Sequence, residues 1–346
     1  MARRILWGSL ALAPVTIFVH YAFHPSDVVE FVLAALALIP LAWLIGEATE
    51  EAAHHTGPGI GGFLNATFGN APELIIALFA VNQASFEVVR GSLTGSVVGN
   101  LLLVLGFSLL FGGRGQIDRE SSLASLALIG IAVLLFLIPA IPGWDGNPER
   151  DSIAWLSVPV SIALLLIYVG ATYVSLRRHR RLHISDVAAE MQAWTLWTAL
   201  LVLGFATIVT AVIAEILVGS IHVFSEEAHL SEFFVAAVII AIVGNAAEHG
   251  GAVVVAARGQ IKLAAEIALA SSAQVAVFLV PAVALLSLLI DPLALSFRVV
   301  EIGVLAAAAL FTFVLLVQGR SSRARGVALI LAYVAVAVAF FAAGDR

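Results

Sequence analysis

The chain carries one pattern twice, first as Gly69-Asn70-Ala71-Pro72-Glu73 and again, 175 positions later, as Gly244-Asn245-Ala246-Ala247-Glu248. Each stretch lies inside a long apolar run and places a carboxylate there. An ionised side chain in bilayer hydrocarbon costs about 2.5 kcal/mol or more, so an acid within a membrane span indicates a functional site. Two such acids in matching contexts indicate that both motifs belong to the functional site.

The similarity between the two stretches continues beyond them. Ser96 follows Glu73 by 23 residues, and Ser271 follows Glu248 by the same distance. Both serines stand in apolar runs that contain other small residues. Equal spacing of two separate motifs indicates that the chain contains a duplicated unit.

Composition places the chain in a membrane. Hydrophobic residues make up 61% and charged residues 12% of the 346 positions, and the mean hydropathy is +1.06. Ordinary soluble domains carry about 25% charged residues. The chain has no cysteine, which excludes disulfides, thiolate metal sites and a cysteine nucleophile. We expect the lipid bilayer as a partner, no nucleic acid partner and no cofactor.

Runs of about 20 apolar residues are needed to cross a bilayer as a helix. Eleven are predicted, at residues 5–23, 27–50, 60–82, 86–110, 122–143, 153–176, 195–221, 231–257, 261–289, 294–317 and 325–343. The first is a leading helix within residues 1–25. The others divide into five-helix repeats at 26–176 and 195–346, joined by a basic linker at 177–194. The predicted fold is an all-α integral membrane protein.

An odd number of helices in a repeat inverts the second copy relative to the first. Inverted repeats are typical of secondary transporters, whose transport site lies near the bilayer midplane between the repeats. Glu73 and Glu248 are therefore expected to approach one another from opposite sides of the membrane.

The basic residues predict the orientation. The linker begins with Arg177-Arg178-His179-Arg180-Arg181, and basic clusters beside membrane helices favour the cytoplasm. With the amino terminus and the linker cytoplasmic, 13 of the 17 Lys and Arg residues fall on the cytoplasmic side. The other four are Arg90, Arg150, Arg298 and Arg346. We expect the plasma membrane of a prokaryote as the location.

The spacing within each motif predicts its chemistry. Asn70 and Glu73 are three residues apart, as are Asn245 and Glu248, so each pair shares a helix face. Glycines and Pro72 predict broken helices, whose free carbonyls become ion ligands where they line a cavity. Such an oxygen-rich site suits Ca²⁺ better than Mg²⁺ or a softer metal. Because one Ca²⁺ or two protons neutralise two carboxylates, and an empty charged site is costly in a membrane, the sequence predicts an antiporter.

Three further residues are candidates for proton coupling or access to the site. Glu50 and Glu215 each follow a small residue in the first helix of a repeat, and Glu215 lies deeper in apolar sequence. His249 adjoins Glu248. A histidine titrates near neutral pH, which suits a proton relay, although packing explains this residue equally well.

The polar end of the second predicted span is interpreted as a solvated helix end. It contains Glu47, Glu51, His54 and His55. The histidines lack the spacing of four residues with an intervening Glu that zinc hydrolases use. We therefore predict that the protein is not an enzyme.

The segment from Gly46 to Leu78, which includes the first motif, resembles the first repeat of the Ca²⁺/H⁺ antiporter family within the calcium/cation antiporter superfamily. Val243–His249 and Ser271–Gln274 resemble the second repeat. The similarity covers essentially the whole chain, and the long first segment is highly specific. The resemblance implies exchange of Ca²⁺ for H⁺.

The resemblance also implies roles for residues at matching positions. Glu73 and Glu248 would be the principal Ca²⁺ and proton ligands. The residues that complete or line the site would be Asn70, Asn245, Ser96, Ser271 and Gln274. The family usually has Ser where this chain has Gly99, so one hydroxyl group is absent here.

The sequence leaves other functions open. A protein of the same fold that exchanges Na⁺ or K⁺ for H⁺ would satisfy the same pattern. A cation channel would also use intramembrane acids, but it would more naturally oligomerise around an axis than duplicate internally with inversion. A homo-oligomeric state is open as well.

Overall fold

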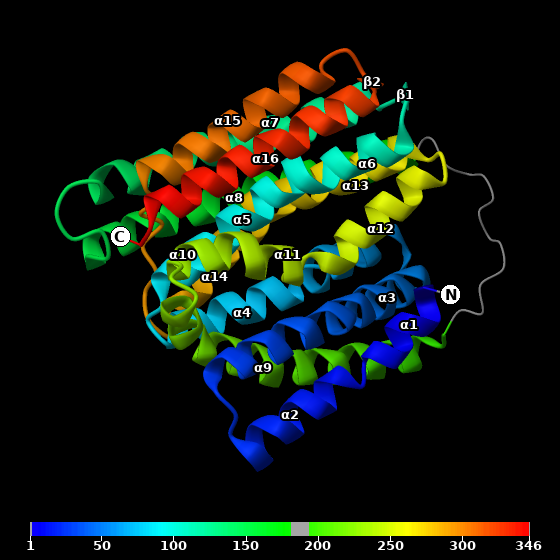
Figure 1. The fold of residues 1–346 in the computed structure, drawn as a ribbon. Coiled ribbons are helices and arrows are strands. Elements are labelled where there is room, and N and C mark those ends of the chain that lie inside the picture. The colour runs from blue at the N-terminus through cyan, green and yellow to red at the C-terminus, as the bar shows by residue number, and fades with distance from the viewer. Residues whose placement is uncertain (1, 181–193, 346) are drawn as a thin grey trace.

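The computed structural model describes the backbone of residues 2–180 and 194–345 (Figure 1). Within these ranges, side chains are described except at residues 2–4, 57–63, 65, 66, 175–180 and 247–249. The described chain is almost entirely helical, with one two-stranded sheet. Most of the predicted linker, residues 181–193, lies outside the described residues.

The leading segment forms α1 (Ala2–Ser9) and α2 (Leu12–Phe23). The first predicted repeat contains α3 (Asp27–Phe68), α4 (Ala71–Asn82), α5 (Phe86–Val98), the π-helix η1 (Gly99–Val104), α6 (Leu105–Gly112), β1 (Gly115–Gln116), α7 (Arg119–Gly143) and α8 (Asp151–Arg180). The second contains α9 (Leu196–Glu227), α10 (Glu232–Phe234), the π-helix η2 (Val235–Ile240), α11 (Ala241–Gly244), α12 (Ala246–Ala257), α13 (Ile261–Gln274), the π-helix η3 (Val275–Leu279), α14 (Val280–Ser287), α15 (Val299–Leu316), β2 (Arg320–Ser321) and α16 (Arg323–Ala343).

Apolar side chains on the outside of the molecule identify it as a membrane protein. Nine helices of the described residues are long and apolar enough to cross a membrane, and Ala71–Asn82 and Glu232–Gly244 form shorter apolar segments. Large side chains such as Trp197, Leu201 and Leu166 are about 70% exposed on these helices. Such surfaces are stable against hydrocarbon rather than water. The predicted all-α integral membrane fold is confirmed.

Two helix boundaries differ from the predicted spans. Helical structure continues from Asp27 to Phe68, so the chain breaks at Gly69 and Asn70 rather than between residues 50 and 60. Hydropathy marks where polar side chains interrupt apolar ones, whereas a helix ends only where its backbone hydrogen bonds end. The span predicted at 5–23 is divided between α1 and α2. Pro14 lies in the first turn of α2, where its missing N–H is tolerated.

Corresponding elements recur at the spacing of the two motifs. The second motif follows the first by 175 positions, and α12 begins and ends 175 positions after α4 begins and ends. The offset also relates both ends of α14 to those of α6. The α5–α6 segment leads into β1, whereas α13, which corresponds to α5, begins in contact with β1. The two copies of this segment therefore run in opposite directions (Figure 1), and the duplication inferred from sequence is visible in the backbone.

The turns after α4 and α12 also match in detail. Gln83 and Arg258 cap these helices with nearly the same backbone angles, φ −94° and −83° with ψ 8° in both. The next residues, Ala84 and Gly259, have positive φ angles of 54° and 86°. A left-handed backbone costs an L-residue roughly 1–2 kcal/mol, whereas glycine adopts it readily. The first copy of the turn therefore carries a strain that the second copy lacks.

This difference gives a pair of opposite expectations. Ala84→Gly should stabilise the protein by about 1 kcal/mol, and Gly259→Ala should destabilise it by a similar amount, because φ stays positive in both turns. Thermal unfolding of the purified protein in detergent measures both effects. Gly204→Ala is the comparison at negative φ: Gly204 lies within α9 with open space around its missing Cβ, so alanine should stabilise the helix by about 0.5–1 kcal/mol, opposite in sign to Gly259→Ala. Shifts of the same sign in the two turns would contradict the expectation.

The two repeats meet so closely that glycine is required. A Cβ atom on Gly95 in α5 would overlap the backbone carbonyl of Ala237 in η2, and one on Gly91 would lie 2.7 Å from the carbonyl oxygen of Phe233. The backbones of α5 and η2 are therefore in direct contact. This contact brings the end of α5, with Ser96, beside the helix that leads to the second motif.

A buried charged cluster joins the repeats at the end of the molecule where α5 and α15 begin. Arg90, which is 2% exposed, contacts the carboxylates of Glu87 and Glu149. Arg298 lies 3.7 Å from Glu87 and 3.0 Å from Glu301, which is fully buried. Arg90 and Arg298 are two of the four basic residues that the sequence assigns to the outer side, and both contact carboxylates of the protein, with Arg90 buried and Arg298 partly buried.

A second ion pair joins the repeats at the end that carries β1 and β2. Lys262 lies 3.0 Å from Asp118, the N-cap residue of α7. The hydrogen bond from Lys262, together with that from the Ser121 backbone amide, holds the pKa of Asp118 below its usual value. Glu87 is the second residue of α5, and Lys262 is the second residue of the corresponding helix α13. Their partners are N-cap residues: Arg298 caps α15, and Asp118 caps α7. The two pairs therefore occupy corresponding positions with their charges exchanged.

Candidate ion-binding site

The first motif sits where α3 ends and α4 begins. Asn70 is the N-cap residue of α4, with φ −100° and ψ 17°, and Glu73 is the third residue of the helix. Pro72 fits here because the first amide groups of a helix have no intrahelical partner. Both Asn70 and Glu73 are buried, at 1% and 6% exposure. The positive end of the α4 dipole thus faces a buried carboxylate.

The second motif has the same backbone geometry. α11 ends at Gly244, and Asn245, with φ −91° and ψ 6°, caps α12. Glu248 is the third residue of α12, as Glu73 is of α4. The side chains of Glu248 and His249 lie outside the described residues. Backbone equivalence alone assigns the two glutamates to corresponding positions.

The two motifs are in contact. A Cβ atom on Gly244 would lie 3.5 Å from Oε1 of Glu73 and 3.7 Å from its carboxyl carbon. The carboxylate of the first motif therefore rests against the backbone of the second. This contact is the central observation about the site, because the two positions belong to different repeats and lie far apart in sequence.

Hydrogen bonds across the repeat boundary surround this contact. The side-chain amide of Asn245 donates to Ser96 Oγ at 2.9 Å, and that of Asn100 donates to Ser271 Oγ at 2.9 Å. Ser272 Oγ donates to the carbonyl oxygen of Val97 at 3.2 Å. Each bond joins a residue of one repeat to a residue of the other. The buried polar residues of the two repeats therefore form one hydrogen-bonded cluster.

The amide groups of this site leave two buried oxygen atoms without a hydrogen-bond donor among the described residues. Nδ2 of Asn245 also donates to the carbonyl oxygen of Ala241 at 2.9 Å, and a carbonyl accepts only, which fixes the amide orientation. Oδ1 of Asn245 and Oδ1 of Asn100 are buried and accept no hydrogen bond from the described residues. A buried acceptor without a donor costs about 1–3 kcal/mol, and a cation satisfies it.

The structure brings together five of the predicted site residues: Asn70, Glu73, Ser96, Asn245 and Ser271 are all buried around the repeat boundary. Gln274 is half-buried one turn after Ser271, where α13 gives way to η3. Glu50 on α3 and Glu215 on α9 have exposed side chains. No hydrogen bond within the described part of the chain links either of these two acids to the buried residues.

Two residues of the site were missed by sequence reasoning. Asn100 lies at the start of η1 and is 1% exposed, and Ser272 is fully buried in α13. Asn100 follows Ser96 by one turn, so its polarity within an apolar span was the available signal. Its equivalent position in the second repeat is Val275, and comparison of the repeats therefore does not reveal it. π-Helices occur often at functional sites, and η1 supplies this residue.

The interpretation of Glu51 as part of a solvated helix end is wrong. Glu51 is 6% exposed, and its Oε2 accepts a hydrogen bond from the backbone amide of Trp194 at 3.0 Å. Nε2 of His55 lies 2.6 Å from the carbonyl oxygen of the same residue. These two side chains hold the backbone of Trp194, just before α9, against the end of α3. Polar residues at a helix end are interpreted as solvent-exposed when the residue that forms hydrogen bonds with them lies far away in the sequence.

Comparison with known proteins agrees with this architecture. The model of the sodium/calcium exchanger protein family matches residues 27–177 and 198–342. The chain belongs to this family. One matched segment falls in each half of the chain, and residues 1–26 and 178–197 lie outside both.

Relatives of this exchanger extend over nearly its whole length. The Ca²⁺/H⁺ antiporter ChaA of Bacillus subtilis is 38% identical over 92% of this chain and 93% of its own. A Ca²⁺/H⁺ antiporter of Aphanothece halophytica is 33% identical over 97% and 96%. The resemblance to the Ca²⁺/H⁺ antiporter family is confirmed, and the family is one of transporters.

Solved structures of two such exchangers superpose on this one. Native YfkE is 34% identical with a TM-score of 0.83, covering 99% of this chain and 100% of its own. The H⁺/Ca²⁺ exchanger CAX has a TM-score of 0.76 at 14% identity, covering 99% and 92%, and this likeness bears on the fold alone. The fold predicted from sequence is that of known membrane transporters.

Proposed function

We propose that this protein exchanges Ca²⁺ for H⁺ across its membrane at one site that both repeats complete. The contact between Glu73 and Gly244 carries the proposal, since it joins the acid of one motif to the backbone of the other. The antiporters that are 38% and 33% identical over nearly the whole chain support Ca²⁺ and H⁺ as the substrates. A relative selective for Na⁺ or K⁺ would share the same contact, so the test includes those ions.

The proposed mechanism assigns Glu73 and Glu248 to both ions. A bound Ca²⁺ neutralises the two carboxylates, and when it leaves, protons neutralise them instead, because two bare carboxylates in a low dielectric repel each other. The amide oxygens of Asn245 and Asn100, together with Asn70, Ser96, Ser271 and Gln274, supply further oxygen ligands that suit Ca²⁺. Exchange follows because the site reorients between the two sides only when it is neutral.

Glu50, Glu215 and His249 are proposed to act in access rather than in ion binding. Glu50 and Glu215 lie on α3 and α9, which pack against one another and flank the broken helices α4 and α12. Their exposed carboxylates suit a path that delivers cations or protons to the buried site. His249 stands beside Glu248 in α12, where it is suited to relay protons.

Ion flux and its pH dependence test the function. Purified protein in liposomes with an imposed pH gradient should take up Ca²⁺ in exchange for protons, in preference to Na⁺, K⁺ or Mn²⁺. Because protons and Ca²⁺ compete for the same acids, apparent Ca²⁺ affinity should weaken as pH falls, and the two acids should titrate as a coupled pair. Empty liposomes are the control. Affinity that stays constant with pH would exclude a shared site, and Ca²⁺ flux without proton movement would indicate a channel.

The proposed orientation places the amino terminus, the linker and the β1–β2 sheet in the cytoplasm of a prokaryote. The positive charges of Arg90 and Arg298 are paired with carboxylates of the protein, which supports this orientation because fewer free basic charges are left on the outer side. The chain has no cysteine, so single cysteines report on one position each. Cysteine at Ala324, which is exposed at the start of α16, should react with a membrane-impermeant maleimide only from inside, and cysteine at the exposed Asp145 only from outside. The reverse pattern, or labelling of both from one side, would contradict the topology.

A further inference from the structure

The end of the molecule with β1 and β2 carries a basic cavity that the exchange mechanism does not use. Its volume is about 440 Å³, and its walls come from the loops around the sheet. Arg114, Arg320 and Arg325 line it, with no acidic residue among the lining side chains. Lys262 holds the nearby acid Asp118. The cavity thus presents three positive charges without an internal counter-charge.

The cavity walls are held in place by hydrogen bonds. β1 pairs with β2, and Ser321 Oγ donates to the carbonyl oxygen of Gly113 at 2.8 Å. The guanidinium group of Arg325 donates to Gln318 Oε1 at 3.0 Å and to the carbonyl oxygen of Arg320. No carboxylate of the described residues lies within ion-pair distance of Arg114 or Arg320. These two guanidinium groups are therefore available to an anion from outside the chain.

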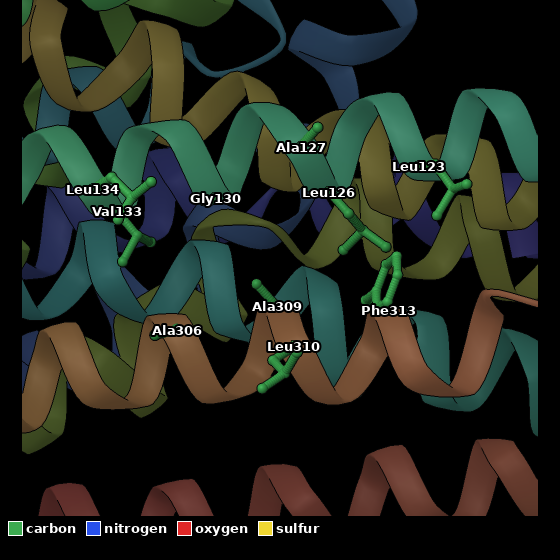
Figure 2. A pocket seen from close by; sticks show the side chains of 10 residues that line it. All are labelled: Leu123, Leu126, Ala127, Gly130, Val133, Leu134, Ala306, Ala309, Leu310 and Phe313. Atoms are coloured by element: carbon green, nitrogen blue, oxygen red, sulfur yellow. The ribbon is translucent and has the colours of Figure 1, made fainter.

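An apolar groove lies between the two helices that adjoin the strands of this cavity, α7 after β1 and α15 before β2. It has a volume of about 510 Å³ and is lined by ten residues of α7 and α15, none of which has a polar side chain (Figure 2). It runs from Leu123 and Phe313, near the β1–β2 end, to Leu134 and Ala306. At 1.5 Å per residue this is about 16 Å along the helices. The groove opens on the hydrocarbon-facing surface, because α7 and α15 are both membrane spans.

We propose that the basic cavity and the apolar groove together bind one anionic phospholipid. The phosphate group would lie between Arg114 and Arg320, since guanidinium groups form paired hydrogen bonds with phosphate. One acyl chain would lie in the groove between α7 and α15. Basic pockets at the cytoplasmic ends of membrane helices favour anionic headgroups.

Charge complementarity favours a lipid over a second copy of the chain. Two copies facing each other through this groove, with the same orientation in the membrane, would bring their arginine cavities together, and like charges would oppose the contact. An anionic lipid satisfies both features at once. The site lies away from the two motifs, so the proposal does not depend on the exchange mechanism.

The headgroup is tested with matched charge variants. In native mass spectrometry of the purified protein, phosphatidylglycerol should bind at least tenfold more tightly than phosphatidylcholine. Arg114→Gln/Arg320→Gln should weaken phosphatidylglycerol about thirtyfold, since each arginine near an anionic lipid contributes on the order of 1 kcal/mol. Arg258→Gln is the control, because Arg258 is exposed beside the start of α13 at the same end of the molecule. Equal binding of the two lipids, or an unchanged double variant, would overturn the proposal.

The acyl chain is tested by filling the groove. Gly130 lines it, and a Cβ atom there meets nothing within 4 Å, so Gly130→Leu fills the groove without a clash at Cβ. This variant should weaken phosphatidylglycerol several-fold, whereas Gly204→Leu, in equally open space on α9, should not. sn-Glycerol 3-phosphate, which has no acyl chain, should compete poorly. Strong competition by it, or an unchanged Gly130→Leu, would reduce the site to a simple anion site and overturn the lipid proposal. A variant is used only if its unfolding temperature without added lipid equals that of the unmodified protein. If the double arginine variant does not fold, the single variant Arg114→Gln is tested in its place.

Discussion

Replacing either Glu73 or Glu248 by glutamine is expected to abolish exchange while leaving the folded protein intact. Glutamine keeps the size of the side chain and resembles the protonated acid, so packing changes little. A single remaining carboxylate no longer balances a divalent ion. Removing one partner of a buried charge pair costs about 3–5 kcal/mol, which lowers apparent Ca²⁺ affinity and flux at least about a hundredfold.

Proton-coupled Ca²⁺ uptake into liposomes measures this effect. Glu226→Gln is the control, because that carboxylate is 68% exposed at the end of α9 and should be nearly silent. Equal amounts of monodisperse protein establish that folding is unchanged. If one motif variant keeps near-normal flux while the other loses it, the two motifs do not form one coupled site, and the contact between Glu73 and Gly244 has no role in binding.

The buried charged cluster predicts a second large effect, on stability. Arg90→Met should lower the free energy of unfolding by about 3–5 kcal/mol, because Glu149 loses its buried partner and Glu87 keeps only Arg298, at 3.7 Å. Glu301 lies beside them without solvent contact, which adds to the repulsion. Thermal or denaturant unfolding in detergent measures the loss. Methionine is chosen because it retains the apolar stem of arginine.

Two further variants separate lost charge from lost packing. Arg90→Met/Glu149→Gln should recover part of the stability, since the second change removes one unpaired carboxylate. Arg258→Met, an exposed arginine at the other end of the molecule, should change stability by less than about 0.5 kcal/mol. Equal losses in the single and double variants would show that packing rather than charge stabilises the cluster.

Sequence reasoning located the motifs because their signal is local. A Gly-Asn pair followed by an acid within apolar sequence marks a helix break and a buried carboxylate together, and the structure shows both at Asn70 and Glu73. The offset between the motifs recurs between α4 and α12 and between α6 and α14 for the same reason, since a duplicated sequence keeps its element lengths. The membrane fold followed from hydropathy.

The features that were missed depend on contacts between distant segments. Hydropathy records that Arg90 is charged but not that Glu149, 59 residues further along the chain, neutralises it. Asn100 has no polar counterpart at the equivalent position of the second repeat, and only its hydrogen bond to Ser271 places it in the site. The helix that continues through the polar stretch before the first motif also reflects backbone hydrogen bonding, which side-chain polarity does not report.

The exchanged charges of the pairs Glu87–Arg298 and Lys262–Asp118 bear on the ancestry of the protein. A molecule assembled from two first halves would set a glutamate against an aspartate at both ends, and one built from two second halves would set a lysine against an arginine. Either assembly is disfavoured by like charge, so separately expressed halves should pair with each other rather than with themselves. Since the duplication, the halves have become complementary, and neither can now take the place of the other.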